Sequence, residues 1–522
     1  MTDSVSVMLN NGLRRFCGSC MVVLLCASGV HGAMAAEIAA DWHAFVQNDM
    51  RGANNDNDEP GMYRNESTAG VSLKMTLVPY RLRFVGDVSF VWTGFSKDKS
   101  FSGLTDMREV SPYYIKSDAA YIEVFRLIPY VDLRIGRQIV QWGAADQFNP
   151  TNNLNALDLG DPLQFGRTIA NQMIRLDFNP GDSDFTLTAV WVPVFQPARL
   201  PGSALLQIGD VSSELPFVSP ETRLAAERLR NIYLTNPTSY DVASPEVTAR
   251  MPETTLKNSQ VGVRAQWLIG NVDASLSWYY GRDSVPVSKR SISTQTPSGR
   301  VSATGTPVMR VLTDVDLVYP RKQVLGFDLA GELPFLGNAG FWLEGAVTFP
   351  GAVTMAFDIT RIVPSATVLR DDVVTDTPFF KGTVGMDYSI GEHVYLLGQF
   401  IHGMPDEFGL EAIRNYCMGM IDVKLLQERL VIRQVVLGEI PHDDDDINLD
   451  DDGDGRVESL ARGATNDGRI GSLVYFPQLI AKPLDGLELT VGAYLRFGHR
   501  ESKFATEAAG PSQIIFSARA SF

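Results

Sequence analysis

Short segments of alternating polarity run along most of this chain. Residues 71–77 read Val-Ser-Leu-Lys-Met-Thr-Leu, so every second side chain is apolar and Lys74 lies on the polar side. Residues 487–497 repeat the pattern, with Glu488 and Arg496 on the polar side. Because successive side chains of a strand point to opposite faces, each segment has one apolar and one polar face. This period of two predicts β-strands.

Such segments recur about 18 times, with 16 or 14 as alternative counts. The predicted strands are 39–48, 71–77, 82–92, 117–128, 131–135, 174–178, 185–191, 261–267, 272–280, 321–333, 340–349, 379–390, 392–402, 413–425, 428–437, 467–477, 487–497 and 514–522. Connections near 79, 129, 181, 270, 336, 391, 426 and 480 are short, whereas long ones lie at 96–116, 143–170, 195–257, 282–320, 350–378, 438–466 and 498–511. This alternation is typical of an all-β transmembrane antiparallel barrel with short periplasmic turns and long extracellular loops.

Composition narrows the class further. The mean hydropathy is −0.02, and the chain has no uninterrupted apolar run long enough for a spanning helix, so it is not a helical membrane protein. In lipid, backbone N–H and C=O groups are satisfied only within the protein, so a spanning sheet closes into a ring. A secreted, soluble all-β protein would show similar alternation and is the alternative fold.

The N-terminal region has the features of a secretory signal peptide. Arg14 and Arg15 precede a short apolar run at 21–30, and Ala-Met-Ala at 33–35 fits a small-x-small cleavage site. The run is too short to span a bilayer as a helix, which needs about 20 residues. Lipidation at Cys26 is the alternative, and the bulky residue before this cysteine disfavours it.

The predicted domains are therefore a signal peptide at 1–35 and one transmembrane β-barrel at 36–522, in the outer membrane of a Gram-negative bacterium. The chain has 45 Lys and Arg against 61 Asp and Glu, a net charge of −16, which argues against nucleic acid as a partner. Three of the four cysteines lie in the predicted signal. The remaining Cys417 allows neither an internal disulfide nor a structural zinc cluster.

The C-terminal residues form another alternating strand. The chain ends in IIFSARASF, with apolar side chains at every second position from Ile514 to Phe522 and the polar Ser517, Arg519 and Ser521 between them. This ending resembles the closing strand of bacterial outer-membrane β-barrels, in which a terminal aromatic residue is read by the barrel-assembly machinery. The resemblance implies that this machinery, outer-membrane lipid and lipopolysaccharide are partners.

A long connection carries the most distinctive motif. Residues 135–162 read IGRQIVQWGAADQFNPTNNLNALDLGDP, and the pattern W-G-x-x-D-x-x-N-P within them comprises Trp142, Gly143, Asp146, Asn149 and Pro150. Over about 130–180 the chain resembles poorly characterised porin-like outer-membrane proteins of Gram-negative bacteria. The resemblance implies no particular substrate.

The connection at 143–170 is long enough to fold back into the barrel and narrow it. Trp142, Asp146 and Asn149 are then residues of a constriction loop, and an ordinary surface loop is the alternative. The insertion at 195–257 is expected to contain a short helix at about 220–232, because Ser219, Pro220 and Glu221 suit a helix start.

Charged side chains on the polar strand faces predict the lining of a lumen. A barrel of 16–18 strands generally leaves an aqueous lumen, and rings of charge set its selectivity. The predicted pore-lining residues are Arg81, Arg83, Asp87, Asp132, Arg134, Arg175, Asp177, Arg264, Asp273, Glu488 and Arg496. The predicted function is a channel for passive diffusion of small-molecule permeants, and a homotrimer is an open alternative to a single barrel.

Two other functions stay open at this point. The charged groups could pair with one another and fill the interior, which would leave a structural or binding barrel with an occluded lumen. A barrel hydrolase could use His402 with Asp406 and Glu407, although a solvated rim histidine is the favoured interpretation. No catalytic residue is predicted, because the chain has no H-E-x-x-H, G-x-S-x-G or Walker motif.

The acidic loop at 438–466 contains the one candidate cofactor site, for calcium in 446–458. Carboxylates at alternate positions can wrap a hard cation with oxygen ligands. The candidate ligands are Asp450, Asp452, Asp454 and Glu458. Ala461 stands where an EF-hand loop has its bidentate glutamate, so either a weak site or a solvated acidic loop is expected.

Overall fold

The computed structural model describes most of the chain beyond the predicted signal peptide. The described residues are 39–54, 60–94, 103–181, 183–201, 238–243, 245–302, 305–362, 367–410, 412–443, 448–449, 458–459, 469–498, 502–505 and 509–522. The predicted signal peptide at 1–35 and the predicted helix at 220–232 lie outside these residues. No helix within the described ranges is long and apolar enough to cross a membrane.

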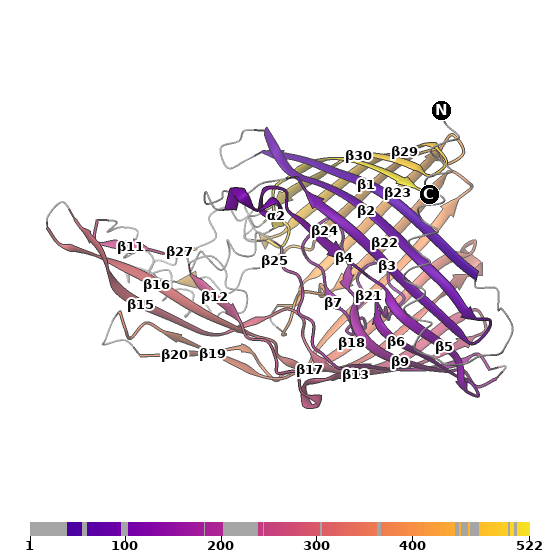
Figure 1. Cartoon of the computed structure of the whole chain (residues 1–522), viewed down its shortest axis with the longest axis horizontal. Helices are drawn as coiled ribbons and strands as arrows, with labels where there is room; N and C mark the ends of the chain where they lie inside the picture. The colour runs from indigo at the N-terminus through magenta and orange to yellow at the C-terminus, as the bar shows by residue number, and fades with distance from the viewer. Residues whose placement is uncertain are drawn as a thin grey trace.

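Eighteen antiparallel strand positions close into a barrel (Figure 1). The last strand pairs back onto the first, with Ser521 opposite Phe45, so the ring has no free edge. The barrel strands are β1 (Ala39–Asn54), β2 (Pro60–Val78), β3 (Leu82–Thr93), β4 (Tyr113–Lys116), β5 (Ala120–Ile128), β6 (Val131–Gln138), β9 (Asn171–Phe178), β10 (Phe185–Val192), β13 (Gln260–Ile269), β14 (Val272–Arg282), β17 (Arg321–Leu333), β18 (Ala339–Pro350), β21 (Phe379–Ile390), β22 (Val394–His402), β23 (Asn415–Leu425), β24 (Leu430–Glu439), β29 (Ser472–Leu484), β30 (Leu487–Gly498) and β31 (Gln513–Ser521). Strands β4 and β5 share one position, since both pair with β3.

The predicted count of about 18 strands is therefore confirmed, and each predicted segment overlaps one position of the ring. Some boundaries differ, and β2 begins at Pro60 rather than at residue 71. The first and last strands meet at the end with the short turns, because Ala39 pairs with Thr76, close to the turn at 79–81. Two-residue turns there need a left-handed backbone, and Tyr130 (φ 68°) and Gly270 (φ 65°) supply it.

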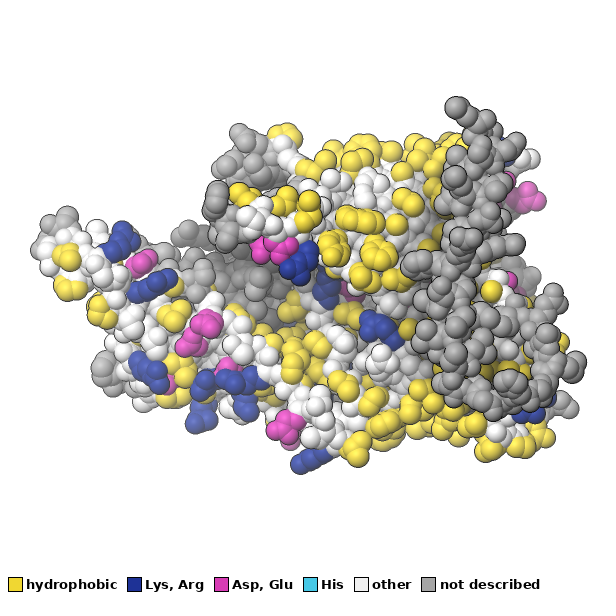
Figure 2. All heavy atoms as spheres, in the orientation of Figure 1, with side chains coloured by type: hydrophobic (Ala, Val, Ile, Leu, Met, Phe, Trp, Pro, Cys, Tyr) yellow, Lys and Arg dark blue, Asp and Glu magenta, His cyan; other side chains and the backbone are white. Residues whose placement is uncertain are grey.

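The outward face of the barrel is apolar and exposed (Figure 2). Leu276 and Ile514, on opposite parts of the ring, have 58% and 55% of their surface accessible. In a water-soluble protein such a continuous apolar surface would be covered. A closed barrel with an apolar outer surface is the architecture of outer-membrane proteins, so the predicted location is supported by the fold itself.

A second sheet projects beyond one end of the barrel, away from the labelled chain ends (Figure 1). It contains β11 (Tyr240–Val242), β12 (Glu246–Ala249), β15 (Val287–Val301), β16 (Pro307–Val318), β19 (Val353–Asp358) and β20 (Leu369–Val374). The long connections at 282–320 and 350–378 thus contain strands that the sequence analysis did not predict. Much of β15 is polar, so its own sequence does not predict a strand, and pairing with β16 and β19 orders it.

The remaining elements within the described residues are short. They are the helical turns η1 (Gly103–Thr105), α2 (Met107–Val110), η2 (Leu256–Asn258) and η3 (Pro334–Leu336), and the strand pairs β7 (Ala156–Leu157) with β8 (Thr168–Ile169), β25 (His442–Asp443) with β28 (Arg469–Ile470), and β26 (Asn448–Leu449) with β27 (Glu458–Ser459).

Candidate functional site

The inner wall of the barrel carries the charged side chains. The register places all but one of the predicted pore-lining residues on inward strand faces, and Arg81 lies in the turn between β2 and β3. These strands alternate so strictly because their other face is the apolar outer surface.

Many of the inward charges pair with one another. Glu123, only 3% exposed, accepts hydrogen bonds from Arg83 Nε and Arg134 Nε, each at 2.8 Å. Further pairs join Arg175 to Asp177 at 2.8 Å and Arg264 to Asp328 at 2.9 Å. These pairs stiffen the wall and leave it polar.

Other predicted lining residues have local structural contacts. Asp87 accepts a hydrogen bond from the backbone N of Asp118 at 2.9 Å and so holds the bulge between β4 and β5. Asp132 accepts one from the backbone N of Arg126 at 2.8 Å. Arg496 Nη1 donates to the carbonyl of Phe504 at 3.3 Å. Asp273 is exposed near a short turn.

The connection between β6 and β9, residues 139–170, crosses the interior of the barrel and is called the inserted segment below. Near its start it contacts β18, β21 and β22. Thr383 Oγ1 donates to the carbonyl of Phe148 at 3.0 Å, and Gln399 Nε2 donates to the carbonyl of Asp146 at 3.3 Å. Near its end the segment contacts β1 and β2, on the opposite side of the ring. It therefore reaches across the lumen.

Glu344 of β18 is the first anchor of the inserted segment. Its carboxylate is fully buried and accepts hydrogen bonds from the backbone N of Ala144, Ala145 and Thr151 at 3.0, 3.2 and 2.9 Å. Thr151 Oγ1 donates at 2.7 Å, and Asn149 Nδ2 donates at 3.1 Å. All five donors come from the inserted segment, so one carboxylate of the wall organises this whole turn.

The motif residues have defined places in this arrangement. A Cβ atom at Gly143 (φ 99°) would lie 2.4 Å from the Glu344 carboxylate, so only glycine fits there. Asn149 Nδ2 also donates to the carbonyl of Ala145 at 2.9 Å, which closes the turn. Trp142 is 3% exposed and packs over Gly262 of β13, where a Cβ atom would lie 2.7 Å from the indole.

Asp146, the third predicted constriction-loop residue, is half-buried in the segment. Burial raises the pKa of its carboxyl above the usual value, and the nearby charge of Asp387 acts in the same direction.

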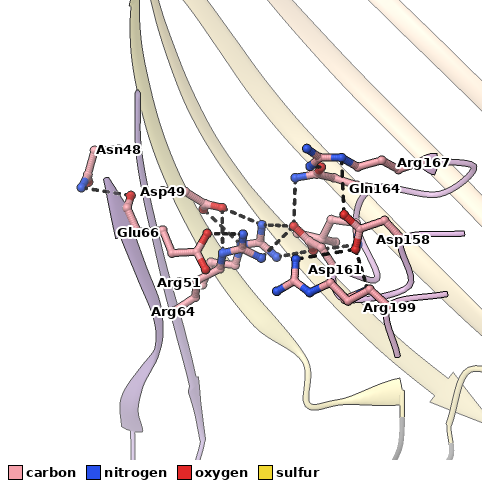
Figure 3. Close-up of polar contacts among 12 residues, drawn as sticks. Asn48, Asp49, Arg51, Arg64, Glu66, Asp158, Asp161, Gln164, Arg167 and Arg199 are labelled. Carbon is pink, nitrogen blue, oxygen red and sulfur yellow. Dashed lines mark hydrogen bonds and ion pairs between the residues drawn. The ribbon is translucent and has the colours of Figure 1, made fainter. Parts of the chain in front are cut away.

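Asp161 provides the second anchor (Figure 3). Arg51 of β1 donates to its carboxylate from Nη1 and Nη2, each 2.7 Å from one oxygen. Arg64 Nη1 of β2 donates to the same carboxylate at 2.9 Å. Arg51 also pairs with Asp49 at 2.6 Å. Burial disfavours the charged carboxylate, but the hydrogen bonds from Arg51 and the charges of both arginines outweigh burial and hold the pKa of Asp161 below its ordinary value.

A looser ion group surrounds this anchor. Asp158 lies 3.6 Å from both Arg167 Nε and Arg199 Nη1, and Arg199 follows β10. Figure 3 shows these arginines on the far side of Asp161 from Arg51 and Arg64. Four carboxylates, of Asp49, Glu66, Asp158 and Asp161, thus accompany four guanidinium groups, of Arg51, Arg64, Arg167 and Arg199.

Apolar contacts fix the inserted segment between its anchors. Val140, Trp142 and Leu154 pack with Val190 and Val192 of β10. Phe148 packs in a second cluster whose wall residues are Trp342, Leu397, Ile401, Tyr416, Met418, Leu437, Val474, Tyr494 and Ile515. Between the two charged anchors, the inner wall therefore meets the segment with apolar side chains.

An open recess of about 470 Å³ remains on the inner wall at the end with the short turns. Its lining residues are Tyr395, Asp422, Lys424, Glu428, Val431, Arg433, Ile480, Lys482 and the predicted Glu488. Asp422 pairs with Arg433 at 2.6 Å, and Lys424 pairs with Glu428 at 2.9 Å. The recess can hold a small polar solute with charges of both signs close by.

The group considered for a hydrolase is not assembled. His402 Nδ1 is 2.8 Å from Asn415 Oδ1, and the ring stacks on Phe380. Asp406 pairs with Lys503 at 2.8 Å, and Glu407 accepts the hydroxyl hydrogen bond of Tyr416. The two carboxylates that could have oriented the histidine are thus bound elsewhere.

The candidate calcium ligands Asp450, Asp452 and Asp454 lie outside the described residues, and Glu458 is described only as part of β27. Among the residues that the structure does describe, no group of three or more His, Cys, Asp or Glu side chains is placed to hold a metal ion.

Sequence reasoning missed both anchors on the barrel wall. Glu344 and Arg51 are charged residues on inward faces, which is a weak signal shared by many positions. Their partners lie far away in the sequence, 193 to 200 residues from Glu344 and 110 residues from Arg51. Only the closed ring brings them together.

Comparison with known proteins identifies one family. Residues 33–398 match the model of the family described as "Protein of unknown function (DUF1302)". No curated protein matches the chain.

Several solved structures are similar over most of their length. OccAB1 of Acinetobacter baumannii is 7% identical, with 92% of this chain and 96% of that chain covered and a TM-score of 0.46. OpdQ of Pseudomonas aeruginosa is 9% identical, with 93% and 97% covered and a TM-score of 0.45. OmpT of Vibrio cholerae, an outer membrane protein in its trimer form, is 9% identical, with 93% and 100% covered and a TM-score of 0.34. Similarity this distant carries no argument about function, which depends instead on the geometry above.

Proposed function

Because this chain belongs to the DUF1302 family, whose description states no function, we propose its function from the barrel itself. The protein is an outer-membrane channel through which small solutes diffuse passively. The inserted segment narrows the lumen, and the recess lined by Glu488 is the vestibule at the end with the short turns.

One observation carries this proposal. A ring of 18 strands encloses a polar wall of paired charges, and the inserted segment crosses the lumen as a loop between two neighbouring barrel strands. A barrel of this size generally leaves an aqueous lumen, whereas a small barrel is filled by its own side chains. A crossing segment reduces the width of such a lumen and positions a few side chains against the solute.

Purified protein in planar lipid bilayers tests the proposal. We expect stepwise increases in current as single barrels insert, and swelling of liposomes in isotonic solutions of small sugars or amino acids. A folded barrel that inserts without any conductance steps and without solute flux would contradict the proposal.

An occluded binding barrel is the second candidate. The tight packing of Phe148 and Trp142 against the inner wall favours it, because these contacts close part of the lumen. In that case inserted barrels would conduct no current, and a small solute would instead raise the thermal stability of the protein.

The implied partners follow from this function. Outer-membrane lipid surrounds the barrel, and a small-molecule permeant enters it. Recognition by the barrel-assembly machinery, contact with lipopolysaccharide and assembly into a homotrimer stay predictions. Chemical cross-linking of the protein in isolated membranes tests the trimer.

Charge selectivity is a further prediction. The recess has Lys424, Arg433 and Lys482 against Asp422, Glu428 and Glu488, so the wild-type channel is expected to discriminate only weakly between cations and anions. Replacing Glu488 with glutamine removes a carboxylate that forms no ion pair among the described residues. The reversal potential in a salt gradient should then shift toward anion selectivity.

The Glu246→Gln variant is the matched control, because Glu246 lies on β12 in the projecting sheet outside the lumen. An equal shift in both variants, or none in Glu488→Gln, would exclude a role of the recess in permeation.

Calcium binding by the acidic loop also stays a prediction. If Asp450, Asp452 and Asp454 hold calcium, titration calorimetry should detect a weak exothermic or endothermic site in the wild type. Asp452→Ala and Asp454→Ala should each lower its affinity, and chelator should lower the thermal stability of the wild type only. The absence of heat with the wild-type protein would exclude calcium binding by this loop.

A further inference from the structure

Two arginines lie directly opposite each other on neighbouring barrel strands. Arg282 at the end of β14 is in register with Arg321 at the start of β17. Like charges at directly opposite positions destabilise a strand pair unless something compensates their repulsion.

The described residues provide no anionic compensation. Arg282 donates to the carbonyl of Tyr319 at 2.7 Å and to Asn258 Oδ1 at 3.0 Å. Arg321 donates to the same Asn258 Oδ1 at 2.8 Å, to the carbonyl of Lys257 at 2.8 Å and to the hydroxyl of Tyr280 at 3.3 Å. All of these acceptors are neutral. Neither guanidinium forms an ion pair with a carboxylate in the part of the chain that the structure describes.

The pair is on the outside of the barrel. Arg282 follows Trp278 and Tyr280 at alternate positions of β14, and these two rings stack with centroids 6.5 Å apart. Trp278 is 37% exposed on the outward face. Tyr279, which lies between Trp278 and Tyr280 in the sequence, is buried inside the barrel. The Arg321 guanidinium lies 5.5 Å from the centre of the Tyr280 ring.

The position matches the headgroup level of the membrane. Stacked tryptophan and tyrosine rings on the outward face are typical of the interface between hydrocarbon and headgroups. Arg282 follows Tyr280 by two residues, and Arg321 is its strand partner, so both arginines lie beyond these rings, toward the long loops and the projecting sheet. There η2 adds Lys257 as a third cation and Leu256, which is 78% exposed, as an apolar contact.

We propose that Arg282, Arg321 and Lys257 bind the phosphate group of an outer-leaflet lipid. A phosphate presents several acceptor oxygens to guanidinium groups, which bind it in a planar, bidentate geometry. Its charge would offset the repulsion between the two arginines, and its acyl chains would lie against Trp278 and the apolar wall below. The proposal depends on the outer-membrane location and not on conductance through the lumen.

Lipid retention by the purified, full-length protein tests the site. Bisphosphorylated lipid A is the probe, and native mass spectrometry and thermal unfolding are the readouts. The wild type should retain lipid A and become more stable with it. The Arg282→Gln/Arg321→Gln double variant should bind about tenfold more weakly or worse, because hydrogen bonds to charged groups are strong.

A matched control removes two other cations. Arg250 and Arg290 both pair with Asp316 at 2.8 Å in the projecting sheet, so Arg250→Gln/Arg290→Gln should leave lipid binding unchanged. The shift of the folded barrel in electrophoresis without heating shows whether each variant folds. Lys257→Gln, at an exposed position, provides a milder test if the double variant does not fold.

Three results would overturn the proposal. They are equal retention by wild type and double variant, equal binding of lipid A from which the phosphates have been removed, and equal stabilisation by inorganic phosphate alone. The last result would assign the site to a soluble anion. Conductance of the double variant separates this proposal from the channel proposal, because loss of lipid binding with normal conductance leaves the channel intact.

Discussion

Replacing Glu344 with alanine is expected to release one end of the inserted segment and to raise the single-channel conductance several-fold. The five donors that this carboxylate binds would remain in a buried site without an acceptor. Each donor left buried costs about 1–3 kcal/mol, so the segment between Ala144 and Thr151 should leave the wall and expose its backbone to water. Single-channel recording measures the conductance, and thermal unfolding in detergent should show a lower midpoint.

Two other variants test whether the acceptor oxygens of Glu344 are what holds the segment. Glu344→Gln keeps one carbonyl oxygen as an acceptor, so its conductance should lie between those of the wild type and the alanine variant. Glu332→Ala removes an exposed carboxylate near the end of β17 and should leave conductance and stability close to those of the wild type. Unchanged conductance in a folded Glu344→Ala protein would mean that the inserted segment does not limit the channel.

The barrel strands could be predicted because lipid imposes a strict pattern on them. The side chains that face the hydrocarbon are apolar, and strands such as β14, with the inward polar Asp273, Ser275 and Ser277, alternate cleanly. In four of the predicted strands, β18, β22, β23 and β24, some inward side chains are apolar and belong to the Phe148 cluster. Apolar residues on both faces weaken the alternation in these four strands, so their sequence gives a weaker strand signal.

The projecting sheet could not be predicted in the same way. Its strands are outside the barrel, where no lipid demands an apolar face, and β15 and β16 are ordered by pairing and by contacts distant in sequence. The W-G-x-x-D-x-x-N-P motif did point to the segment that enters the lumen. It did not reveal Glu344, because a single acidic residue in a strand gives no sign of its partners.

Replacing Asp161 with asparagine is expected to loosen the other end of the inserted segment. Arg51 is 3% exposed and, among the residues that the structure describes, would keep Asp49 alone as an ion-pair partner. A hydrogen bond to a charged group contributes about 1.5–3 kcal/mol, and two of them join Arg51 to Asp161. The variant should show frequent fluctuations between conductance levels and a lower free energy of unfolding. A double-mutant cycle with Arg51→Gln should give a large coupling energy, whereas additive effects would contradict the contact.

The same carboxylate gives a pH dependence with a definite sign. An aspartate in the unfolded chain has a pKa of about 3.9. Arg51 and Arg64 hold the pKa of Asp161 lower in the folded protein. The stabilisation is therefore present at neutral pH and persists down to the unfolded value. It is lost as the pH falls through the folded pKa. Given that reference value, the current of wild-type channels should be steady from neutral pH to about 4. Frequent fluctuations between conductance levels should begin only in stronger acid. Asp161→Asn channels should fluctuate at every pH, because asparagine has no proton to lose and the anchor is absent throughout. Wild-type fluctuations that begin near pH 6 would assign the transition to another group.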